Sequence, residues 1–322
     1  MKALVYTGPE AMAFQEAADP APGEGEVLIA VDSVGICGSD MHAYLGHDAR
    51  RPAPLILGHE AAGTIRGGPR DGERVTVNPL VTCGTCPACR SGRENLCPSR
   101  QIISMPPREG AFAPLLAMPE RNLVTVPDDV PLSKAALAEP LAVSWHAAKL
   151  ALDALHPAME RRALVLGGGA IGLAAALALK AMGAAQVQLV EPNATRRAYL
   201  GAFVDAVAEA RGDWPLVIDA VGYAATRATA TALAQPGGVI AHIGLGQDEG
   251  GLDVRRMTLQ EITFIGTYTY TAQDFRDTAE ALFDGRLGAL DWTETRPLSE
   301  GARAFADIRA GTVAAPKIIL TP

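Results

Sequence analysis

The stretch that decides the fold lies at residues 162–172 and reads RALVLGGGAIG. Its first five residues are mostly apolar and predict a short buried strand. The Ala- and Leu-rich run from Ala170 to Met182 predicts a helix. The pattern G-x-G-x-x-G lies between them, formed by Gly167, Gly169 and Gly172. This order of strand, glycine turn and helix predicts the first unit of a parallel sheet.

The glycine turn has the spacing of a dinucleotide-binding site. Gly167 permits the tight turn, Gly169 lets the backbone approach a pyrophosphate, and Gly172 lets the helix pack on the strand. Ile171 lies within the same motif and belongs to the candidate site. The pyrophosphate would face the unpaired N–H groups of the helix N-terminus. A plain tight turn is the alternative.

An acidic residue marks the end of the next predicted strand. Glu191 follows residues 187–190 and lies nineteen positions after Gly172. A carboxylate there binds the adenine ribose hydroxyls and repels a 2′-phosphate, which favours NAD over NADP. Arg196 and Arg197 keep NADP open, because a nearby arginine can accept that phosphate. A solvated pair at a helix start is the other interpretation of the two arginines.

The residues around this motif divide the chain into two kinds of structure. Further strands at residues 216–219 and 239–243 alternate with helices, which predicts a doubly wound parallel sheet. The N-terminal part of the chain, to about residue 130, reads instead as short strands broken by glycine and proline, for example at 24–35, 73–77 and 123–126.

Helices and a last strand complete the α/β fold. A helix is predicted from Pro131 and another from Leu141 to Leu155, with a later helix at 274–283 and a strand at 317–320. We expect a β-rich domain formed by residues 1–144 and 269–322, and a parallel-sheet domain formed by residues 145–268.

Four cysteines lie within fifteen positions, in the spacing C-x2-C-x2-C-x7-C. They are Cys83, Cys86, Cys89 and Cys97. In a reducing compartment such spacings indicate metal rather than disulfides. Four thiolates make a closed, tetrahedral, structural zinc site.

A second group of metal-binding residue types lies upstream. Cys37 and the adjacent pair His59 and Glu60 are candidate zinc ligands, and Glu139 is another candidate for the third position. Three protein ligands with one open position make a catalytic zinc site. The alternatives are a buried cysteine, a hydrogen-bonded core histidine, and a glutamate that favours a helix N-terminus.

Composition excludes several partners. The 322-residue chain has a formal net charge of −8 and a pI near 5.3, which argues against binding nucleic acid or an anionic membrane. Its N-terminus does not read as a secretion signal, and no apolar run reaches the ~20 residues of a membrane span. We therefore expect a cytoplasmic protein.

Taken together, the motifs resemble those of the zinc-containing medium-chain alcohol dehydrogenases, and the resemblance covers essentially the whole chain. The matching segments are Val34–Asp40, Leu57–Ala62, the four-cysteine loop, Glu139–Ala142, Gly167–Gly172 and Asp219–Gly222. The family fold implies a GroES-like β-rich catalytic domain, built from both chain ends, around an inserted Rossmann domain. Glu139 before Pro140 is more similar to the polyol (sorbitol) and threonine dehydrogenase branch than to the ethanol branch.

The resemblance also implies roles for single residues. Zinc would be held by Cys37, His59 and either Glu60 or Glu139, with a water. Arg196 would contact the adenine ribose, and Lys317 would lie near the pyrophosphate. The nicotinamide would lie beside the backbone of Gly244 and Leu245.

A proton path through Ser39 and His42 is implied as well. Ser39 lies two residues after Cys37, and His42 three residues further on. The alternative is that Ser39 caps a short helix over residues 40–44 and that His42 is merely exposed.

The implied reaction is hydride transfer between NAD and a secondary alcohol, in the first place a polyol, with two zinc ions per chain. An enzyme for L-threonine or another alcohol of the same branch, a zinc-independent reductase and a non-catalytic nucleotide-binding relative are the alternatives. Family members are usually homodimers or homotetramers. One departure stands out: only 27 residues separate Glu191 from Asp219, so the helix after the third Rossmann strand is expected to be clipped.

Overall fold

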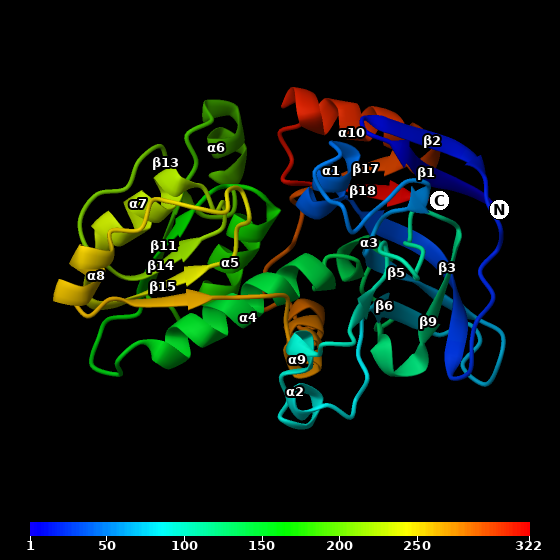
Figure 1. Ribbon diagram of the computed structural model, residues 1–322, viewed down its shortest axis with the longest axis horizontal. Helices are drawn as coiled ribbons and strands as arrows, with labels where there is room; N and C mark the ends of the chain where they lie inside the picture. Colours follow the sequence, from blue (N-terminus) through cyan, green and yellow to red (C-terminus); the bar gives the residue numbers. More distant parts are fainter. The chain divides into compact units, whose positions relative to one another are not determined.

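A computed structural model describes residues 1–322, which form two compact units (Figure 1). The first unit contains Met1–Glu139, Thr271–Asp284 and Leu290–Pro322, and the second contains Pro140–Tyr270 and Gly285–Ala289. The sequence predicts boundaries after residues 144 and 268, whereas the structure divides after residues 139 and 270.

The first unit is built on a seven-stranded sheet with the order β10-β6-β5-β3-β18-β17, and β9 also pairs with β3. The strands are β3 (Glu26–Gly35), β5 (Glu60–Arg66), β6 (Arg74–Val77), β9 (Leu115–Pro119), β10 (Leu123–Thr125), β17 (Thr293–Pro297) and β18 (Lys317–Thr321). Because β18 pairs with β3, the two ends of the chain build this sheet together.

Smaller elements complete the first unit. A three-stranded sheet has the order β2-β1-β4, and β7 pairs with β8. The hydrophobic core of the first unit includes Leu4, Ile29, Ile65 and Phe112, all fully buried. The elements are β1 (Lys2–Gly8), β2 (Ala11–Glu16), β4 (Leu55–Ile56), β7 (Leu80–Val81), β8 (Gln101–Ile102), α1 (Gly38–Tyr44), α2 (Pro87–Arg90), α3 (Leu132–Ala135), α9 (Ala272–Phe283) and α10 (Gly301–Ala310).

The second unit contains a six-stranded sheet with the order β13-β12-β11-β14-β15-β16, and every pair of neighbouring strands is parallel. This is the doubly wound order, in which the direction of winding reverses between β11 and β14. The strands are β11 (Arg162–Leu166), β12 (Gln186–Val190), β13 (Asp205–Val207), β14 (Trp214–Asp219), β15 (Ala234–His242) and β16 (Thr263–Gly266).

Helices cover this sheet. Helix α5 packs against β11 and β12, and α7 packs against β14 and β15 (Figure 1). The apolar residues that make the strands, among them Leu164, Val217 and Ile240, form the core beneath the helices. The helices are α4 (Ala138–Ala154), α5 (Ala170–Ala181), α6 (Ala194–Leu200), α7 (Ala224–Leu233) and α8 (Val254–Leu259).

Two details bear on the sequence analysis. Helix α4 begins at Ala138 rather than after Pro140, because proline is tolerated in a first turn, where its missing N–H has no helical partner. Residues 208–213 join β13 to β14 without a helix, as the short spacing from Glu191 to Asp219 predicts.

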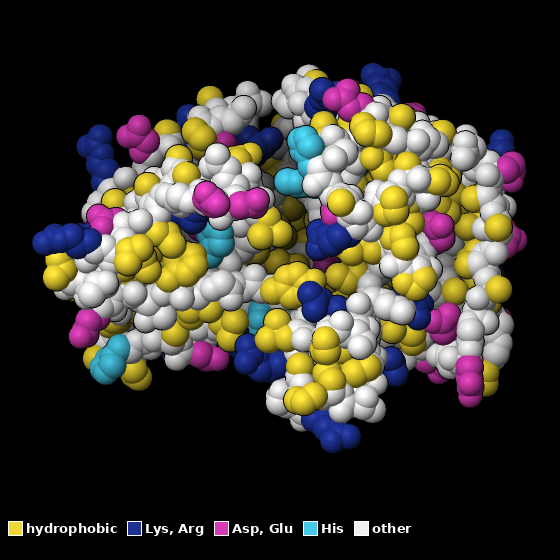
Figure 2. Space-filling model, viewed as in Figure 1, with side chains coloured by type: hydrophobic (Ala, Val, Ile, Leu, Met, Phe, Trp, Pro, Cys, Tyr) yellow, Lys and Arg dark blue, Asp and Glu magenta, His cyan; other side chains and the backbone are white.

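The surface follows the composition. On the face shown in Figure 2, lysine and arginine side chains are spread among acidic and apolar ones. None of the helices combines the length and the apolar character that crossing a membrane requires.

Candidate metal centres and dinucleotide turn

The first candidate metal centre forms where β3 ends and β5 begins. Cys37 follows β3 as the N-cap of α1, and Gly35 pairs with Glu60 across the two strands. This register brings one ligand atom each of Cys37, His59 and Glu60 within 4.8 Å of one another. The structure therefore unites three of the four predicted ligands. Glu139 lies outside this group.

The Glu60 carboxylate is fully buried, and its two oxygens differ. Oε1 accepts a hydrogen bond of 2.6 Å from Lys317 Nζ, whereas Oε2 has no hydrogen-bond partner. A Cβ added at Gly35 would lie 2.0 Å from Oε2. A buried carboxylate oxygen without a partner is costly unless a cation completes it. Together with the sulfur and imidazole donors, this oxygen fits a zinc ion.

Lys317 lies at this centre. Its side chain is buried, and its ammonium group donates to the Ile36 carbonyl at 2.9 Å as well as to Glu60. Burial lowers the pKa of Lys317, but the negative charges of Glu60 and Cys37 outweigh burial and raise it. Both of these partners belong to the first unit, and the place of Lys317 beside a pyrophosphate stays a prediction.

A carboxylate that the motif analysis gave no role faces His59. The Asp40 Oδ1 lies 3.4 Å from His59 Nδ1, and its Oδ2 accepts the Cys37 backbone N–H at 3.0 Å. Burial opposes ionisation of both groups. Even so, His59 and Arg51 lower the pKa of Asp40, and Asp40 and Cys37 raise the pKa of His59 well above its ordinary value. A carboxylate on one ring nitrogen is the usual way to orient a metal-binding histidine.

Two serines flank the same imidazole. Ser39 Oγ lies 3.4 Å from His59 Nε2, and Ser104 Oγ lies 3.4 Å from Nδ1. The buried Arg51 side chain donates to the Ser104 carbonyl at 3.0 Å and to the Ser39 carbonyl at 3.4 Å. Arg51 thus ties together the two segments that enclose His59. The sequence carried no sign of this role, because the partners are far apart along the chain.

The start of helix α1 shows whether Ser39 is a helix cap. Its N-cap is Cys37, and Asp40, the third helical residue, accepts the Cys37 N–H. The interpretation of Ser39 as the cap is therefore wrong. His42 is exposed on the same helix, with its ring centroid 6.4 Å from that of His47.

The second candidate metal centre is the four-cysteine loop. The sulfurs of Cys83, Cys86, Cys89 and Cys97 all lie within 4.8 Å of one another, and three of the separations are 3.5, 3.5 and 3.9 Å. A tetrahedron of ~2.3 Å zinc–sulfur bonds has edges of about 3.8 Å. Backbone N–H groups lower the pKa of Cys83 to about 5, whereas burial raises that of Cys89 to about 11. The four sulfurs fit one zinc ion.

The glycine turn of the second unit has the predicted form. Gly167 has φ +100°, and Gly169 is the N-cap of α5. A Cβ added at Gly172 would lie 1.8 Å from the Gly167 carbonyl oxygen, so only glycine fits there. Ile171 lies in the first turn of the helix, and its carbonyl accepts the Ser144 hydroxyl at 2.9 Å. The turn leaves the N-terminal N–H groups of α5 available to an anion.

Glu191 lies beside this turn at the end of β12. Its Oε2 accepts the Gly168 N–H at 3.1 Å, and its Oε1 accepts the Asn193 N–H at 2.8 Å. Arg196 NH1 lies 3.6 Å from Oε2, while Arg197 donates to the Glu191 carbonyl at 2.8 Å. The two backbone hydrogen bonds fix the carboxylate, and only Arg196 forms an ion pair with it, because Arg197 donates to backbone carbonyls.

Gly244 and Leu245 come shortly after β15, at the carboxyl edge of the same sheet. A Cβ added at Gly244 would lie 2.1 Å from the Val221 backbone, so the two segments touch directly. Leu245 is 77% exposed, the most exposed large apolar side chain of the chain. The place of both residues beside a nicotinamide stays a prediction.

Comparisons with known proteins agree with this architecture. The family described as alcohol dehydrogenase GroES-like domain matches residues 23–128, and that described as zinc-binding dehydrogenase matches residues 170–284. The chain is 33% identical over 310 residues to L-galactonate-5-dehydrogenase of Escherichia coli K12, covering 90% of this chain and 89% of that protein. It is 40% identical over 196 residues to sorbitol dehydrogenase of Bacillus subtilis, covering 58% and 54%.

Solved structures extend the likeness. An alcohol dehydrogenase from Escherichia coli CFT073, solved with NADH, has a TM-score of 0.89 and 25% identity, with 100% of this chain and 99% of that chain covered. A zinc-binding dehydrogenase from Sinorhizobium meliloti 1021, solved with NADP, has a TM-score of 0.89, 26% identity and the same coverage.

A GroES-like unit with a candidate metal centre, together with a Rossmann unit, defines an oxidoreductase that acts on alcohols. The chain belongs to the zinc-containing medium-chain alcohol dehydrogenase family, in its polyol branch.

Proposed function

We propose that this protein is a zinc-dependent dehydrogenase that transfers a hydride from a secondary alcohol of the polyol class to NAD. The observation that carries the proposal is the set of half-buried Cys37 with buried His59 and Glu60, in which one Glu60 carboxylate oxygen has no hydrogen-bond partner. A zinc ion bound there would polarise the substrate hydroxyl and lower its pKa.

The surrounding residues prepare this set. Asp40 orients the His59 ring, and Arg51 fixes the segments that carry Ser39 and Ser104. Lys317 balances the negative charge of Glu60 and holds its Oε1, which leaves Oε2 as the ligand atom. We therefore favour Glu60 over Glu139 as the third protein ligand.

The polyol class rests on the relatives, which are named for sorbitol and for the sugar acid L-galactonate. L-Threonine and simple secondary alcohols are the competing substrates. A panel of polyols, sugar acids, threonine, butanediol and simple secondary alcohols, followed by NADH absorbance, tests the class. Turnover of threonine or a simple alcohol well above every polyhydroxy compound would overturn it.

The metal assignment predicts two zinc ions per chain. Cys37→Ser should lose one equivalent and the activity together. Cys89→Ser should instead lower stability, because structural zinc contributes folding free energy. Elemental analysis with a thermal melt measures both effects. Full activity in Cys37→Ser would favour a zinc-independent reductase, and tight cofactor binding without turnover would favour a non-catalytic relative.

The proton of the alcohol needs a path out of the site, and we assign it to Ser39 and His42. Ser39 lies against His59, and its hydroxyl can accept and donate. Because general acid–base help is worth ~10²–10⁴ in rate, Ser39→Ala should lower kcat by about that factor with zinc content unchanged. A near wild-type kcat would move the path to Glu139 or to water.

NAD is the proposed cofactor, because the fixed Glu191 carboxylate would repel a 2′-phosphate. Arg196 is expected at the adenine ribose. Steady-state kinetics with both cofactors tests this, and an equal or higher kcat/KM with NADP would point to Arg196 and Arg197 as phosphate ligands. A homodimer or homotetramer remains our expectation, which analytical ultracentrifugation would test.

A further inference from the structure

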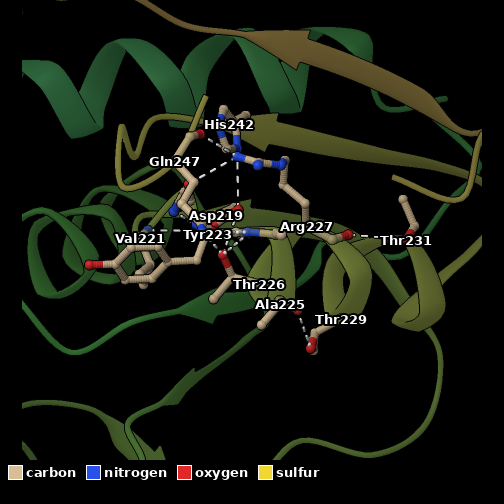
Figure 3. A network of polar contacts seen from close by, with 12 residues as sticks. Asp219, Val221, Tyr223, Ala225, Thr226, Arg227, Thr229, Thr231, His242 and Gln247 are labelled. Atoms are coloured by element: carbon tan, nitrogen blue, oxygen red, sulfur yellow. Dashed lines mark hydrogen bonds and ion pairs between the residues drawn. The ribbon is translucent and has the colours of Figure 1, made fainter. Parts of the chain in front are cut away.

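In the second unit, the side chain of Arg227 donates hydrogen bonds to backbone carbonyls. Arg227 lies on α7, is 5% exposed, and donates to the carbonyls of Gly222, Gln247, Glu249 and Gly250. Figure 3 shows Arg227 with Gln247. The distances to Gly222 and Gln247 are 2.9 Å, and that to Gly250 is 2.6 Å. A planar guanidinium with five N–H donors can serve four carbonyls at once, which a lysine ammonium cannot.

Three of these carbonyls belong to one segment, residues 243–253, which we name the β15–α8 loop. A second set of contacts joins the loop to the start of α7. The Gln247 N–H donates to the Gly222 carbonyl at 2.9 Å, and its side-chain Oε1 accepts the Ala224 N–H at 2.9 Å. The loop is therefore fastened to the N-terminal end of α7, mainly through Arg227.

The same end of α7 reaches the glycine turn. Asp219, the last residue of β14, accepts the N–H groups of Val221 and Gly222 at 3.0 and 2.9 Å. The Val221 side chain lies against Gly167, where an added Cβ would be 2.3 Å from it. The turn, the start of α7 and the loop thus touch in sequence at the carboxyl edge of the sheet, where ligands of doubly wound folds bind.

We infer that Arg227 is the positioning residue for the nicotinamide half of the cofactor, an inference that rests on the proposed function. Arg227 touches no reacting atom. It fixes the β15–α8 loop against α7, and the loop begins with the directly packed Gly244 and the exposed Leu245. The pyrophosphate and adenosine parts rely on Gly167, Gly169 and Glu191 instead, which Arg227 does not contact.

This division gives a selective test with two ligands. ADP-ribose carries every part of NADH except the nicotinamide. In Arg227→Lys, the Kd of NADH should rise about tenfold, as expected for the loss of hydrogen bonds from a charged group, while the Kd of ADP-ribose stays within about twofold. Titration calorimetry on the zinc-loaded full chain measures both. An equal loss for both ligands, or no loss for NADH, would overturn the inference.

Two further variants serve as a control and as a second test of the loop. Arg256→Lys is the matched control, because Arg256 donates to the carbonyls of Thr231 and Ala234 at the opposite end of α7. It should leave both Kd values within about twofold, and a selective loss of NADH there would contradict the assignment. Gln247→Ala alters an exposed side chain, so it should fold even if Arg227→Lys does not, and it should weaken NADH selectively.

Failure of the proposed function would look different. If the wild-type chain binds neither NADH nor ADP-ribose, the dinucleotide site itself is wrongly assigned. If it binds both and Arg227→Lys weakens both equally, the cofactor assignment stands and the positioning role of Arg227 falls.

Discussion

Gly35 shows how one missing side chain can shape a metal centre. The residue lies in β3 between β5 and β18, paired with Glu60 on one side and Ile319 on the other. The Glu60 carboxylate occupies the space that any Cβ at Gly35 would fill. The carboxylate can therefore turn toward Cys37 and His59 while Lys317 holds its other oxygen.

Gly35→Ala should consequently displace Glu60 and weaken the first metal centre. We expect a loss of about 10- to 100-fold in zinc affinity or activity, the range for disturbed support of a metal ligand. The four-cysteine loop should keep its zinc, so elemental analysis under mild chelation should fall from two equivalents to one. Gly38→Ala is the control, because an added Cβ there meets nothing within 4 Å. Two retained equivalents in Gly35→Ala would contradict this account.

The ligand types at this centre could be read from the sequence, but their support could not. Cysteine and histidine in a familiar spacing predict a metal site wherever the fold places them. The choice between Glu60 and Glu139 depends on the pairing of Gly35 with Glu60, which no local pattern specifies. The roles of Asp40 and Arg51 could not be predicted, because they arise from contacts with residues 12 to 53 positions away along the chain.

Among the elements, the four-cysteine loop reaches beyond its own metal centre. Glu94 lies in the loop between Cys89 and Cys97, and its carboxylate accepts the Ala272 N–H at 2.5 Å. Ala272 is the first residue of α9, whose N-cap is Thr271. A carboxylate at a helix N-terminus accepts a hydrogen bond from a free N–H and interacts favourably with the positive end of the helix dipole.

Glu94→Ala should therefore destabilise the protein by about 0.5–2 kcal/mol, the range for a lost helix cap. Urea unfolding of the zinc-loaded protein measures the change, and amide exchange should quicken at the start of α9. Arg93→Ala, an exposed neighbour in the same loop, is the control. Unchanged exchange at residues 272–275 would show that the Thr271 cap alone suffices.

A second link joins the turn before β6 to β10. Glu73 accepts two hydrogen bonds from Arg70, at 2.6 and 2.7 Å, and one from Thr125. These bonds lower the pKa of Glu73 from 4.5 to about 2. A carboxyl group whose pKa is lower in the folded state than in the unfolded state stabilises the folded state. This contribution is complete above the unfolded-state pKa and is lost as the pH falls toward the folded-state pKa.

The wild-type chain should accordingly lose more stability than Glu73→Gln between pH 4.5 and pH 2. Glu73→Gln should be the less stable protein at pH 6, and the two should converge as the pH falls. Urea midpoints of both proteins at several pH values measure this. A constant offset between the two curves would mean that the ion pair contributes nothing through its ionisation.

The elements themselves were predictable to different degrees. Strand β11 and helix α5 follow directly from the apolar run and the glycine turn, because both lie in the core of the second unit. Strand β17 could not be predicted, because its sequence TETRP is polar and only partly buried and only the pairing with β18 makes it a strand. Such edge strands carry no apolar alternation for a pattern to detect.

For the whole molecule, the division into two units separates the two kinds of ligand. Every candidate zinc ligand lies in the first unit, whose sheet joins both ends of the chain. The glycine turn, Glu191 and the β15–α8 loop all lie in Pro140–Tyr270, which has a hydrophobic core of its own. A change from β-rich sequence to strand–helix alternation near residue 145 predicts this division, since each pattern buries its apolar residues in a different way.

Because none of the candidate zinc ligands lies in the dinucleotide turn, removal of zinc should abolish turnover and spare cofactor binding. After treatment with a chelator, the full chain should bind NADH with a Kd within about threefold of the zinc-loaded value, a change of less than ~1 kcal/mol. NADH fluorescence titration measures the affinity, and elemental analysis verifies the metal content. Cys37→Ser, which should lack only the catalytic zinc, is the milder comparison and should bind NADH like wild type. If NADH affinity instead falls in proportion to lost zinc while circular dichroism shows that the Rossmann unit is still folded, binding of the cofactor depends on the metal centres and the two units do not bind their ligands independently.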